Sequence, residues 1–340
     1  MHTLLAAHEA TAAARLPSAV RDYYATGSGD QMAAREAETA WGARRLRPRV
    51  LRDVGSVDTS LTLLGTSLRT PVLVAPSALH GLAHPDGEAA TARGAANAGS
   101  LLVLSTRASR RLEDVPCGPW WFQAYVMRDR GLTRALVQRA AAAGATAVVV
   151  TGDTPYLGTR PGAGRTSLAT DPLVNVAQHL AADDDGSRST EQDPTADLDV
   201  IAEIASAAGL PVLVKGVLRG DDASACLDAG AAGIVVSNHG GRQLDRALPT
   251  AAALPEVVDA VGGRAPVLVD GGLRSGTDVL VALALGADAV LLGRPVLWAL
   301  AADGAAGVRA CLDGMTADLA HVMGLAGARS LAEVSRDLVD

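Results

Sequence analysis

The stretch Gly233-Ile234-Val235-Val236-Ser237-Asn238-His239-Gly240-Gly241-Arg242 contains the pattern that decides the fold. Its first four residues form a short, uninterrupted β-branched run, which predicts a strand buried on both faces. A polar cluster follows directly where this strand ends. Histidine is the residue type that changes protonation near neutral pH, arginine is a permanent cation suited to a carboxylate, and glycines let a ligand approach the backbone. The predicted strand therefore places a titratable histidine and a carboxylate-binding arginine at its carboxyl end.

Similar apolar runs recur along the chain, and alanine-rich amphipathic segments separate most of them. Buried strands that alternate with helices predict a parallel sheet, and eight such strands predict a closed (β/α)8 TIM barrel. An open doubly wound sheet is the alternative, but no GxGxxG motif follows the first strand, which disfavours its dinucleotide-binding form. The expected strands are 72–75, 101–104, 121–126, 147–151, 211–214, 233–236, 266–269 and 289–292, and the clearest helices are 88–98, 132–143, 221–229 and 276–285.

We expect a single domain over all 340 residues, because a barrel of this class takes about 250 residues or more. Residues 1–70 are predicted to form helices, broken by a glycine-rich turn, and then a hairpin that closes the bottom of the barrel. Residues 71–300 are expected to form the barrel, and residues 301–340 further helices. Within the barrel, residues from about 158 to 197 interrupt the alternation of strands and helices with a polar stretch. We expect a lid there that is partly disordered without ligand.

Composition narrows the class of protein. Hydrophobic residues make up 49% of the chain, as in an ordinary globular protein. The net charge is −7 and charges of both signs are interspersed, which argues against a nucleic-acid partner. No uninterrupted apolar run reaches about 18 residues and no signal-like segment opens the chain, so we expect no membrane contact and a cytoplasmic location. Three widely spaced cysteines predict neither a disulfide framework nor a metal site.

The residues that end the strands belong together, because the active sites of such barrels lie at the carboxyl ends of the strands. After the seventh and eighth strands, glycines are followed by arginines, which is typical of a phosphate site. The other strand ends supply neutral hydrogen-bonding groups and the only lysine of the chain, which suit a flat heterocycle. Flavin mononucleotide (FMN) fits both halves. The residues predicted to bind it are Ser77, Ala78, Leu79, Ser105, Gln123, Thr151, Lys215, Ser237, Asp270, Gly271, Gly272, Arg274, Gly293 and Arg294.

Several motifs carry a resemblance that covers nearly the whole chain. The most specific is Ser-Asn-His-Gly-Gly-Arg-Gln-Leu-Asp at residues 237–245. With these motifs the chain resembles the FMN-dependent 2-hydroxy-acid oxidase and dehydrogenase family. The other motifs are Asp22-Tyr23-Tyr24, Ala75-Pro76-Ser77-Ala78, Gln123-Ala124-Tyr125, Asp153-Thr154-Pro155, Leu213-Val214-Lys215-Gly216, Asp270-Gly271-Gly272 and Gly293-Arg294-Pro295.

The resemblance implies a catalytic group of three residues. His239 would be the base that takes the substrate hydroxyl proton, while the hydrogen on Cα passes to the flavin as hydride or by way of a carbanion. Asp153 would stabilise the resulting imidazolium, although Asp-Thr-Pro is also a helix-start signal, so a capping role is the alternative. Tyr125 would hydrogen-bond the substrate. Lys215 would lie near flavin N1 and its C2 carbonyl.

The resemblance also implies how the substrate is held. Arg160 and Arg242 would bind its carboxylate through their forked donors, and Tyr23 would hydrogen-bond it. Arg107 departs from the family pattern, because many members place an apolar or aromatic side chain there. We hypothesise that Arg107 meets a second anionic or strongly polar group of the substrate. The alternatives are that it turns outward to solvent or pairs with an acidic residue of the lid.

The function expected from these residues is oxidation of an (S)-2-hydroxy acid to a 2-oxo acid, with O2 as the electron acceptor and H2O2 as the by-product. Within the same chemistry, a dehydrogenase that uses quinone or cytochrome and an oxidative-decarboxylating monooxygenase are alternatives. A non-redox FMN enzyme of the isomerase type and a flavin-binding protein without turnover are further alternatives. The residues tailored to a carboxylate argue against the isomerase type. The family resemblance implies a homotetramer.

Overall fold

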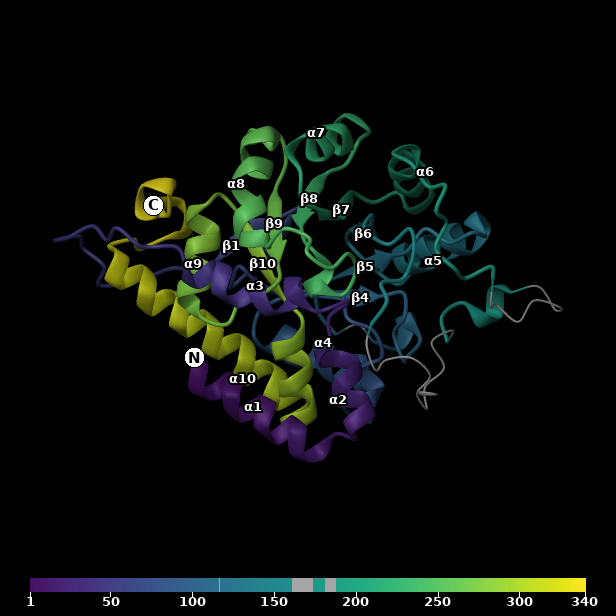
Figure 1. Cartoon of the computed structure of the whole chain (residues 1–340), viewed down its shortest axis with the longest axis horizontal. Helices are drawn as coiled ribbons and strands as arrows, with labels where there is room; N and C mark the ends of the chain where they lie inside the picture. The colour runs from purple at the N-terminus through teal and green to yellow at the C-terminus, as the bar shows by residue number, and fades with distance from the viewer. Residues whose placement is uncertain (116, 161–173, 181–187) are drawn as a thin grey trace.

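Eight parallel strands close into a barrel in the order β10-β3-β4-β5-β6-β7-β8-β9, which confirms the predicted fold class (Figure 1). The computed structural model describes residues 1–115, 117–160, 174–180 and 188–340. Apart from the closure between β10 and β3, each strand pairs with the next one along the chain. The strands are β3 (Val72–Val74), β4 (Leu102–Ser105), β5 (Trp120–Ala124), β6 (Val148–Thr151), β7 (Val212–Val217), β8 (Gly233–Val236), β9 (Val267–Asp270) and β10 (Ala289–Leu292).

The predicted and observed strands agree most closely where the apolar run is uninterrupted, as in β8 and β10. Strand β7 is longer than expected and ends at Val217 rather than Val214. Its pairing with β8 continues past Lys215 through a register shift, and Gly216 at that point has a positive φ of 108°. Lys215 ends the apolar sequence pattern, but the backbone of β7 stays paired with β8 up to Val217.

Helices surround the barrel and bury its outer face. The large hydrophobic cluster lies between strands and helices, and a second cluster fills the barrel interior with side chains such as Leu73, Val103 and Trp121. Such a filled interior is typical of this fold, so ligands bind at the rim and not through a pore. The helices that follow the strands are α4 (Gly87–Asn97), α5 (Arg130–Ala142), α6 (Asp199–Ala208), α7 (Gly220–Asp228), α8 (Thr250–Val261) and α9 (Gly276–Ala284).

The N-terminal segment has the predicted order of elements. Helices α1 (His2–Arg15), α2 (Ser18–Ala25) and α3 (Met32–Gly42) come first, with a turn between α2 and α3. The antiparallel hairpin of β1 (Leu61–Leu63) and β2 (Thr66–Leu68) follows. Leu63 and Leu68 belong to the interior cluster with Ala147 and Ala289, which lie where barrel strands begin. The hairpin therefore covers the end of the barrel opposite the strand carboxyl ends.

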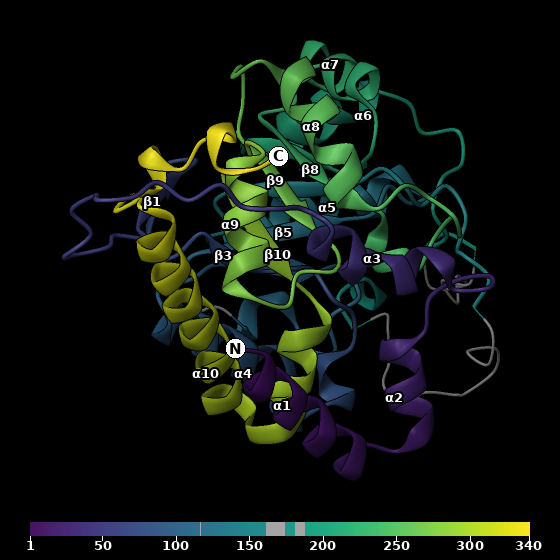
Figure 2. The same ribbon diagram turned by 60° about the vertical axis from the view of Figure 1, so that its left-hand side comes forward.

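Helix α10 (Arg294–Ala326) runs alongside α1 in both views (Figures 1 and 2). It has non-helical backbone at Asp303 and Gly304, so it combines a barrel helix with a C-terminal helix. The helices expected within residues 301–340 are α-helical to Ala326, and beyond it the described elements are the 3-10 helices Leu331–Glu333 and Arg336–Leu338. By length and composition α10 is the one described helix that could cross a membrane, but 72% of its most apolar window is buried inside the protein.

The predicted lid from about residue 158 to 197 lies partly outside the described residues, namely at 161–173 and 181–187. Of the described pieces, residues 188–193 run antiparallel to the segment after β5. The backbone N–H of Arg128 donates to the Glu191 carbonyl at 2.8 Å, and that of Asp193 donates to the Val126 carbonyl at 2.8 Å. This piece is thereby fixed against the barrel rim.

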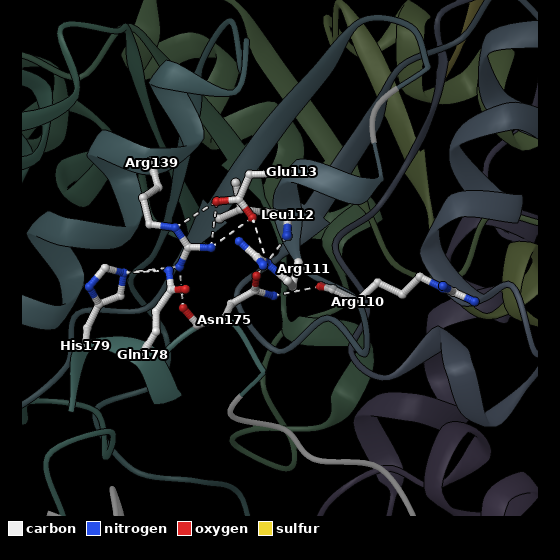
Figure 3. Close-up of polar contacts among 8 residues, drawn as sticks. All are labelled: Arg110, Arg111, Leu112, Glu113, Arg139, Asn175, Gln178 and His179. Atoms are coloured by element: carbon white, nitrogen blue, oxygen red, sulfur yellow. Dashed lines mark hydrogen bonds and ion pairs between the residues drawn. The ribbon is translucent and has the colours of Figure 1, made fainter. Parts of the chain in front are cut away.

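A second described piece, residues 174–180, is tied to α5 and to the loop after β4 (Figure 3). Arg139 of α5 binds both oxygens of Glu113, and its Nη1 donates to the Asn175 carbonyl at 2.6 Å. The Asn175 side chain accepts from the Leu112 backbone N–H at 2.8 Å and donates to the Arg110 carbonyl at 2.9 Å. These contacts join the segment after β6 to the loop that follows β4.

Candidate active site

A cavity of about 380 Å³ opens at the carboxyl ends of the barrel strands, within the size range of small-molecule and cofactor sites. Most of the residues predicted from sequence line it, and they come from strand ends distributed around the barrel. The lining includes Tyr23, Ser77, Ala78, Leu79, Ser105, Arg107, Tyr125, Arg160, Lys215, His239, Arg242, Asp270, Gly271, Gly272, Arg274, Gly293 and Arg294.

The remaining four predicted residues are Gln123, Thr151, Ser237 and Asp153, which lie behind the cavity wall. The Gln123 amide donates to Thr151 Oγ1 at 2.8 Å and accepts from Ser105 Oγ at 3.1 Å. Ser237 Oγ accepts from Lys215 Nζ at 2.9 Å. Gln123, Ser237 and Asp153 are linked by hydrogen bonds to Ser105, Lys215 and His239 at the cavity, and Thr151 is linked to Ser105 through Gln123, so the four orient side chains that a ligand would meet.

His239 and Asp153 form a pair, with 3.1 Å between Nδ1 and a carboxylate oxygen. They come from the ends of β8 and β6. His239 has a positive φ of 57°, and its backbone N–H donates to Ser237 Oγ at 3.0 Å. Such backbone is unfavourable for a residue with a Cβ and is concentrated at functional sites. No helix starts after Asp153 in the described residues up to 160, so the capping alternative is wrong.

Asp153 is held in its charged form. Burial alone would raise the pKa of its carboxyl group, but the charge and hydrogen bond of His239, together with Lys215, outweigh burial and leave that pKa below its ordinary value. A carboxylate beside an imidazole stabilises the protonated ring. The pair is therefore equipped to accept a proton at His239.

Arg160 and Arg242 lie over the same tyrosine. Their guanidinium carbons are 4.9 Å and 5.3 Å from the centre of the Tyr23 ring. Arg242 Nη1 donates to the carbonyls of Tyr23 at 2.7 Å and Thr26 at 3.1 Å. Burial, and then Arg160, lowers the pKa of Arg242 to about 10. Neither arginine has a carboxylate partner among the described residues, so the pair is a ready site for an anion.

Lys215 is buried among polar groups at the end of β7. Its Nζ lies 3.2 Å from Asp270 Oδ2, in addition to its bond with Ser237. The other Asp270 oxygen is buried without a partner in the described part of the chain. A buried ion pair with an unused acceptor is costly unless a ligand completes its hydrogen bonds. The hydroxyl and ring groups of a flavin nucleotide fit this donor and acceptor set.

The residues after β9 and β10 fit a phosphate. Arg294 opens α10, and its Nη2 is buried without a partner among the described residues. Burial, and then Arg242 and Arg274, lowers the pKa of Arg294 to about 10. Gly271 and Gly272 have positive φ values of 90° and 84°, a backbone conformation that glycine adopts most readily. A helix start, buried arginines and glycine amides together bind phosphate well.

Gln243 and Glu88 are among the residues at the site that were missed from sequence. Gln243 donates to the carbonyls of Asp153 at 3.0 Å and Tyr156 at 2.8 Å, and so holds the loop that carries Asp153. Its place inside the motif at 237–245 was a signal. Glu88 is buried in α4 and accepts from the backbone N–H groups of His80 and Ser109, both at 2.9 Å. It ties together the loops after β3 and β4, and no local pattern marked it.

The fold and the cavity define a (β/α)8 barrel with room for a phosphorylated cofactor next to an arginine pair suited to an anion. The model of the FMN-dependent dehydrogenase family matches residues 12–340. The chain is 43% identical to glycolate oxidase 1 of Oryza sativa subsp. indica, over 97% of this chain and 93% of that protein. It is 42% identical to the L-lactate oxidase of Nostoc sp., over 96% and 95% of the two chains.

Solved structures agree with these relatives. A crystal structure of mandelate oxidase superposes with a TM-score of 0.91 at 41% identity, covering 99% of this chain and 97% of that one. The protein belongs to the FMN-dependent dehydrogenase family. The cofactor and the family predicted from sequence are thereby confirmed.

Proposed function

We propose that this protein is an FMN-dependent oxidase that converts an (S)-2-hydroxy acid into the corresponding 2-oxo acid and passes the two electrons to O2, giving H2O2. The observation that carries the proposal is that His239, paired with Asp153 behind the wall, lies in one cavity with Arg160, Arg242 and the residues predicted to bind FMN. The names of the relatives support it, since they are glycolate, L-lactate and mandelate oxidases.

The reaction breaks an O–H and a Cα–H bond of the substrate and forms a carbon–oxygen double bond. His239 takes the hydroxyl proton. Its Nδ1 is held by Asp153, which leaves Nε2 as the nitrogen for proton transfer. Because the Asp153 carboxylate stays ionised, it offsets the charge that the imidazole gains.

The substrate carboxylate lies against Arg160 and Arg242, whose fixed positions set the orientation of Cα. Tyr125 keeps its proton, since burial, and then Asp153, raises the pKa of its phenol to about 12. It therefore donates a hydrogen bond to the substrate. Tyr23 contributes a second phenol beside the two arginines.

FMN, when bound, supplies the two-electron acceptor for the substrate and returns the electrons to O2. Lys215 and Ser105 would hold the polar edge of the flavin ring, with Gln123 and Thr151 behind the wall to orient Ser105. The phosphate would lie at Arg274 and Arg294, together with the glycines of the same two loops.

The proposal is tested by product stoichiometry. The FMN-loaded protein is supplied with a panel of (S)-2-hydroxy acids in air, and O2 uptake, H2O2 and organic products are measured. We expect one 2-oxo acid and one H2O2 for each O2 consumed. Release of CO2 with an acid one carbon shorter would instead identify a monooxygenase. Oxidation only with an added quinone or cytochrome would identify a dehydrogenase, and no oxidation would contradict the proposal.

Replacing Asp153 changes the pH dependence of the reaction. In Asp153→Asn we expect kcat/KM to fall by about 100-fold, and the acidic limb of its pH profile to move to lower pH. The sign follows from the coupling of the two groups, because His239 lowers the pKa of the Asp153 carboxyl group and this stabilising charge pair is absent in Asp153→Asn. The control is Asp129→Asn, at the start of α5 and outside the cavity. An unshifted acidic limb in Asp153→Asn contradicts the assigned role.

We also propose that the protein is a homotetramer, on the basis of the family resemblance, and that it acts in the cytoplasm. One rice relative, 43% identical, is named a peroxisomal (S)-2-hydroxy-acid oxidase. Light scattering after size-exclusion chromatography measures the oligomer, and cell fractionation measures the location.

A further inference from the structure

Arg107 forms part of the cavity wall at the end of β4 and has no role in the reaction described so far. Its backbone is fixed on both sides. Its N–H donates to Ser105 Oγ at 3.1 Å, and its carbonyl accepts from the Leu79 N–H at 3.0 Å. The side chain is half-buried, and its Nη2 donates to the Thr190 carbonyl at 2.7 Å. Arg107 therefore does not turn outward to solvent.

The Thr190 carbonyl, which accepts from the Arg107 guanidinium, belongs to a backbone segment that is fixed on the barrel rim. Thr190 belongs to the piece that runs antiparallel to the segment after β5, between the backbone bonds of Ser189 and Glu191 to residues 129 and 128. Gln192, two residues further on, lines the same cavity. The guanidinium is thus held at the cavity wall by the Thr190 carbonyl, and the backbone of Arg107 and that of Thr190 are both fixed by hydrogen bonds.

Both acidic residues of the lid piece 188–193 are bound to other arginines. Glu191 lies 2.9 Å from Arg128, and Asp193 lies 2.9 Å from Arg130. Within the described residues Arg107 has no carboxylate partner, and the Thr190 carbonyl is its one side-chain acceptor. The hypothesis of pairing with a lid acid is therefore not supported by the described part of the lid.

The other cations at the cavity already have anions to pair with. Lys215 pairs with Asp270 at 3.2 Å. In the proposed function, the arginine pair at Tyr23 holds the substrate carboxylate, and the arginines after β9 and β10 hold the phosphate. Arg274 also pairs with Glu38 at 3.0 Å, so among the described cations of the cavity Arg107 is the one that neither a carboxylate nor an assigned ligand group neutralises. A partly desolvated charge without a counter-ion is unfavourable, so a ligand that supplies one gains affinity.

Arg107 and Tyr125 follow the neighbouring strands β4 and β5 two residues beyond the paired Ser105 and Gln123, and both line the cavity together with Tyr23. Burial lowers the pKa of its guanidinium, while the nearby Tyr125 and Tyr23 raise it. Both tyrosines are assigned to the substrate in the proposed function. A group that extends from the substrate Cα past these phenols would meet the donors of Arg107.

We infer that the preferred substrate is a 2-hydroxy dicarboxylic acid whose second carboxylate pairs with Arg107. The inference rests on the proposed function, because the first carboxylate must occupy Arg160 and Arg242. A guanidinium binds a carboxylate through two parallel N–H···O bonds, which gives charge and direction together. The same chemistry gives no such gain for glycolate, lactate or mandelate, whose side chains carry no charge.

The test compares kcat/KM for (S)-malate and (S)-2-hydroxyglutarate with that for (S)-lactate and (S)-mandelate. We expect the wild-type protein to prefer at least one diacid by about tenfold or more, and Arg107→Met to lower kcat/KM for that diacid by about 100-fold. For lactate the change in Arg107→Met should stay within about threefold. Arg107→Lys keeps the charge but not the forked donors of the guanidinium, so its kcat/KM for the diacid should lie between the values of the wild type and of Arg107→Met.

Two controls separate charge from shape and folding. The first is the diacid in which the distal carboxylate is replaced by its amide, which has the same shape without the charge, and Arg107→Met should change its kcat/KM little. The second is Arg110→Met, because Arg110 lies on the same loop but donates to the carbonyls of Asp86 and Pro85 outside the cavity. The visible flavin spectrum of each variant reports whether it folds and binds FMN.

The outcomes are distinct. If monoacids are oxidised at least as well as diacids and Arg107→Met leaves their ratio unchanged, the inference is overturned and the proposed function stands. The inference is also overturned if Arg107→Met lowers kcat/KM equally for the diacid and for its amide, because the charge of the distal group then has no effect. If the wild-type protein oxidises no acid, the proposed function fails and the inference fails with it.

Discussion

His239→Gln should lower kcat/KM for the best 2-hydroxy acid by about 10⁴-fold, the upper end of what a general base contributes. Glutamine retains a polar side chain but cannot accept a proton at neutral pH. The nearby described carboxylates are not free to replace this base, because Asp153 lies behind the wall and contacts His239, and Asp270 is paired with Lys215. Steady-state kinetics with O2 uptake measures the effect.

The loss in His239→Gln should fall on the chemical step and not on binding. The carboxylate site at Arg160 and Arg242 is intact, so the dissociation constant of the unreactive 2-oxo acid should stay within about threefold of wild type. His321→Gln, on the exposed surface of α10, is the matched control. Retention of more than a tenth of the activity by His239→Gln, with FMN bound, would show that another group is the base.

Arg242→Met should have the second largest effect, a fall of about 10³-fold in kcat/KM, because a buried charge-assisted contact with the substrate carboxylate is lost. The guanidinium is already placed by the carbonyls of Tyr23, Tyr24 and Thr26, so little entropy is lost when a carboxylate binds. The measurement compares a 2-hydroxy acid with its methyl ester, which cannot form the ion pair.

The ester distinguishes carboxylate binding from a structural role of Arg242. If Arg242 acts on the carboxylate, the acid loses activity in Arg242→Met while the slow reaction of the ester changes little. If Arg242 only anchors the turn after α2, acid and ester fall together. Arg242→Lys keeps the charge without the fork and should lose about tenfold to 100-fold for the acid.

The fold could be predicted from sequence because buried parallel strands leave a clear signal. The run Gly233–Val236 has the same bounds in sequence pattern and structure. The signal failed where chemistry interrupts a strand, as at Lys215, since β7 continues through Gly216 to Val217. It also did not distinguish the α-helix that ends at Ala326 from the 3-10 helices that follow it.

The site was predictable where its residues lie inside one motif or at strand ends, as for His239 and Arg242. Contacts between segments far apart in the sequence could not be predicted. Glu88 joins backbone groups of His80 and Ser109, and the Thr190 carbonyl binds Arg107, although 83 residues separate the last two. Such contacts depend on how loops pack above the barrel, and a sequence pattern records only local periodicity.

Anaerobic mixing of the FMN-loaded protein with a panel of (S)-2-hydroxy acids tests the central claim most directly. The account predicts that the visible flavin band bleaches with at least one acid, that the band returns when air is admitted, and that His239→Gln with FMN bound bleaches far more slowly. Deuterium at the substrate Cα should slow the bleaching, because that bond breaks in the step. If no 2-hydroxy acid bleaches the bound flavin, or if bleaching is as fast in His239→Gln, the account is contradicted.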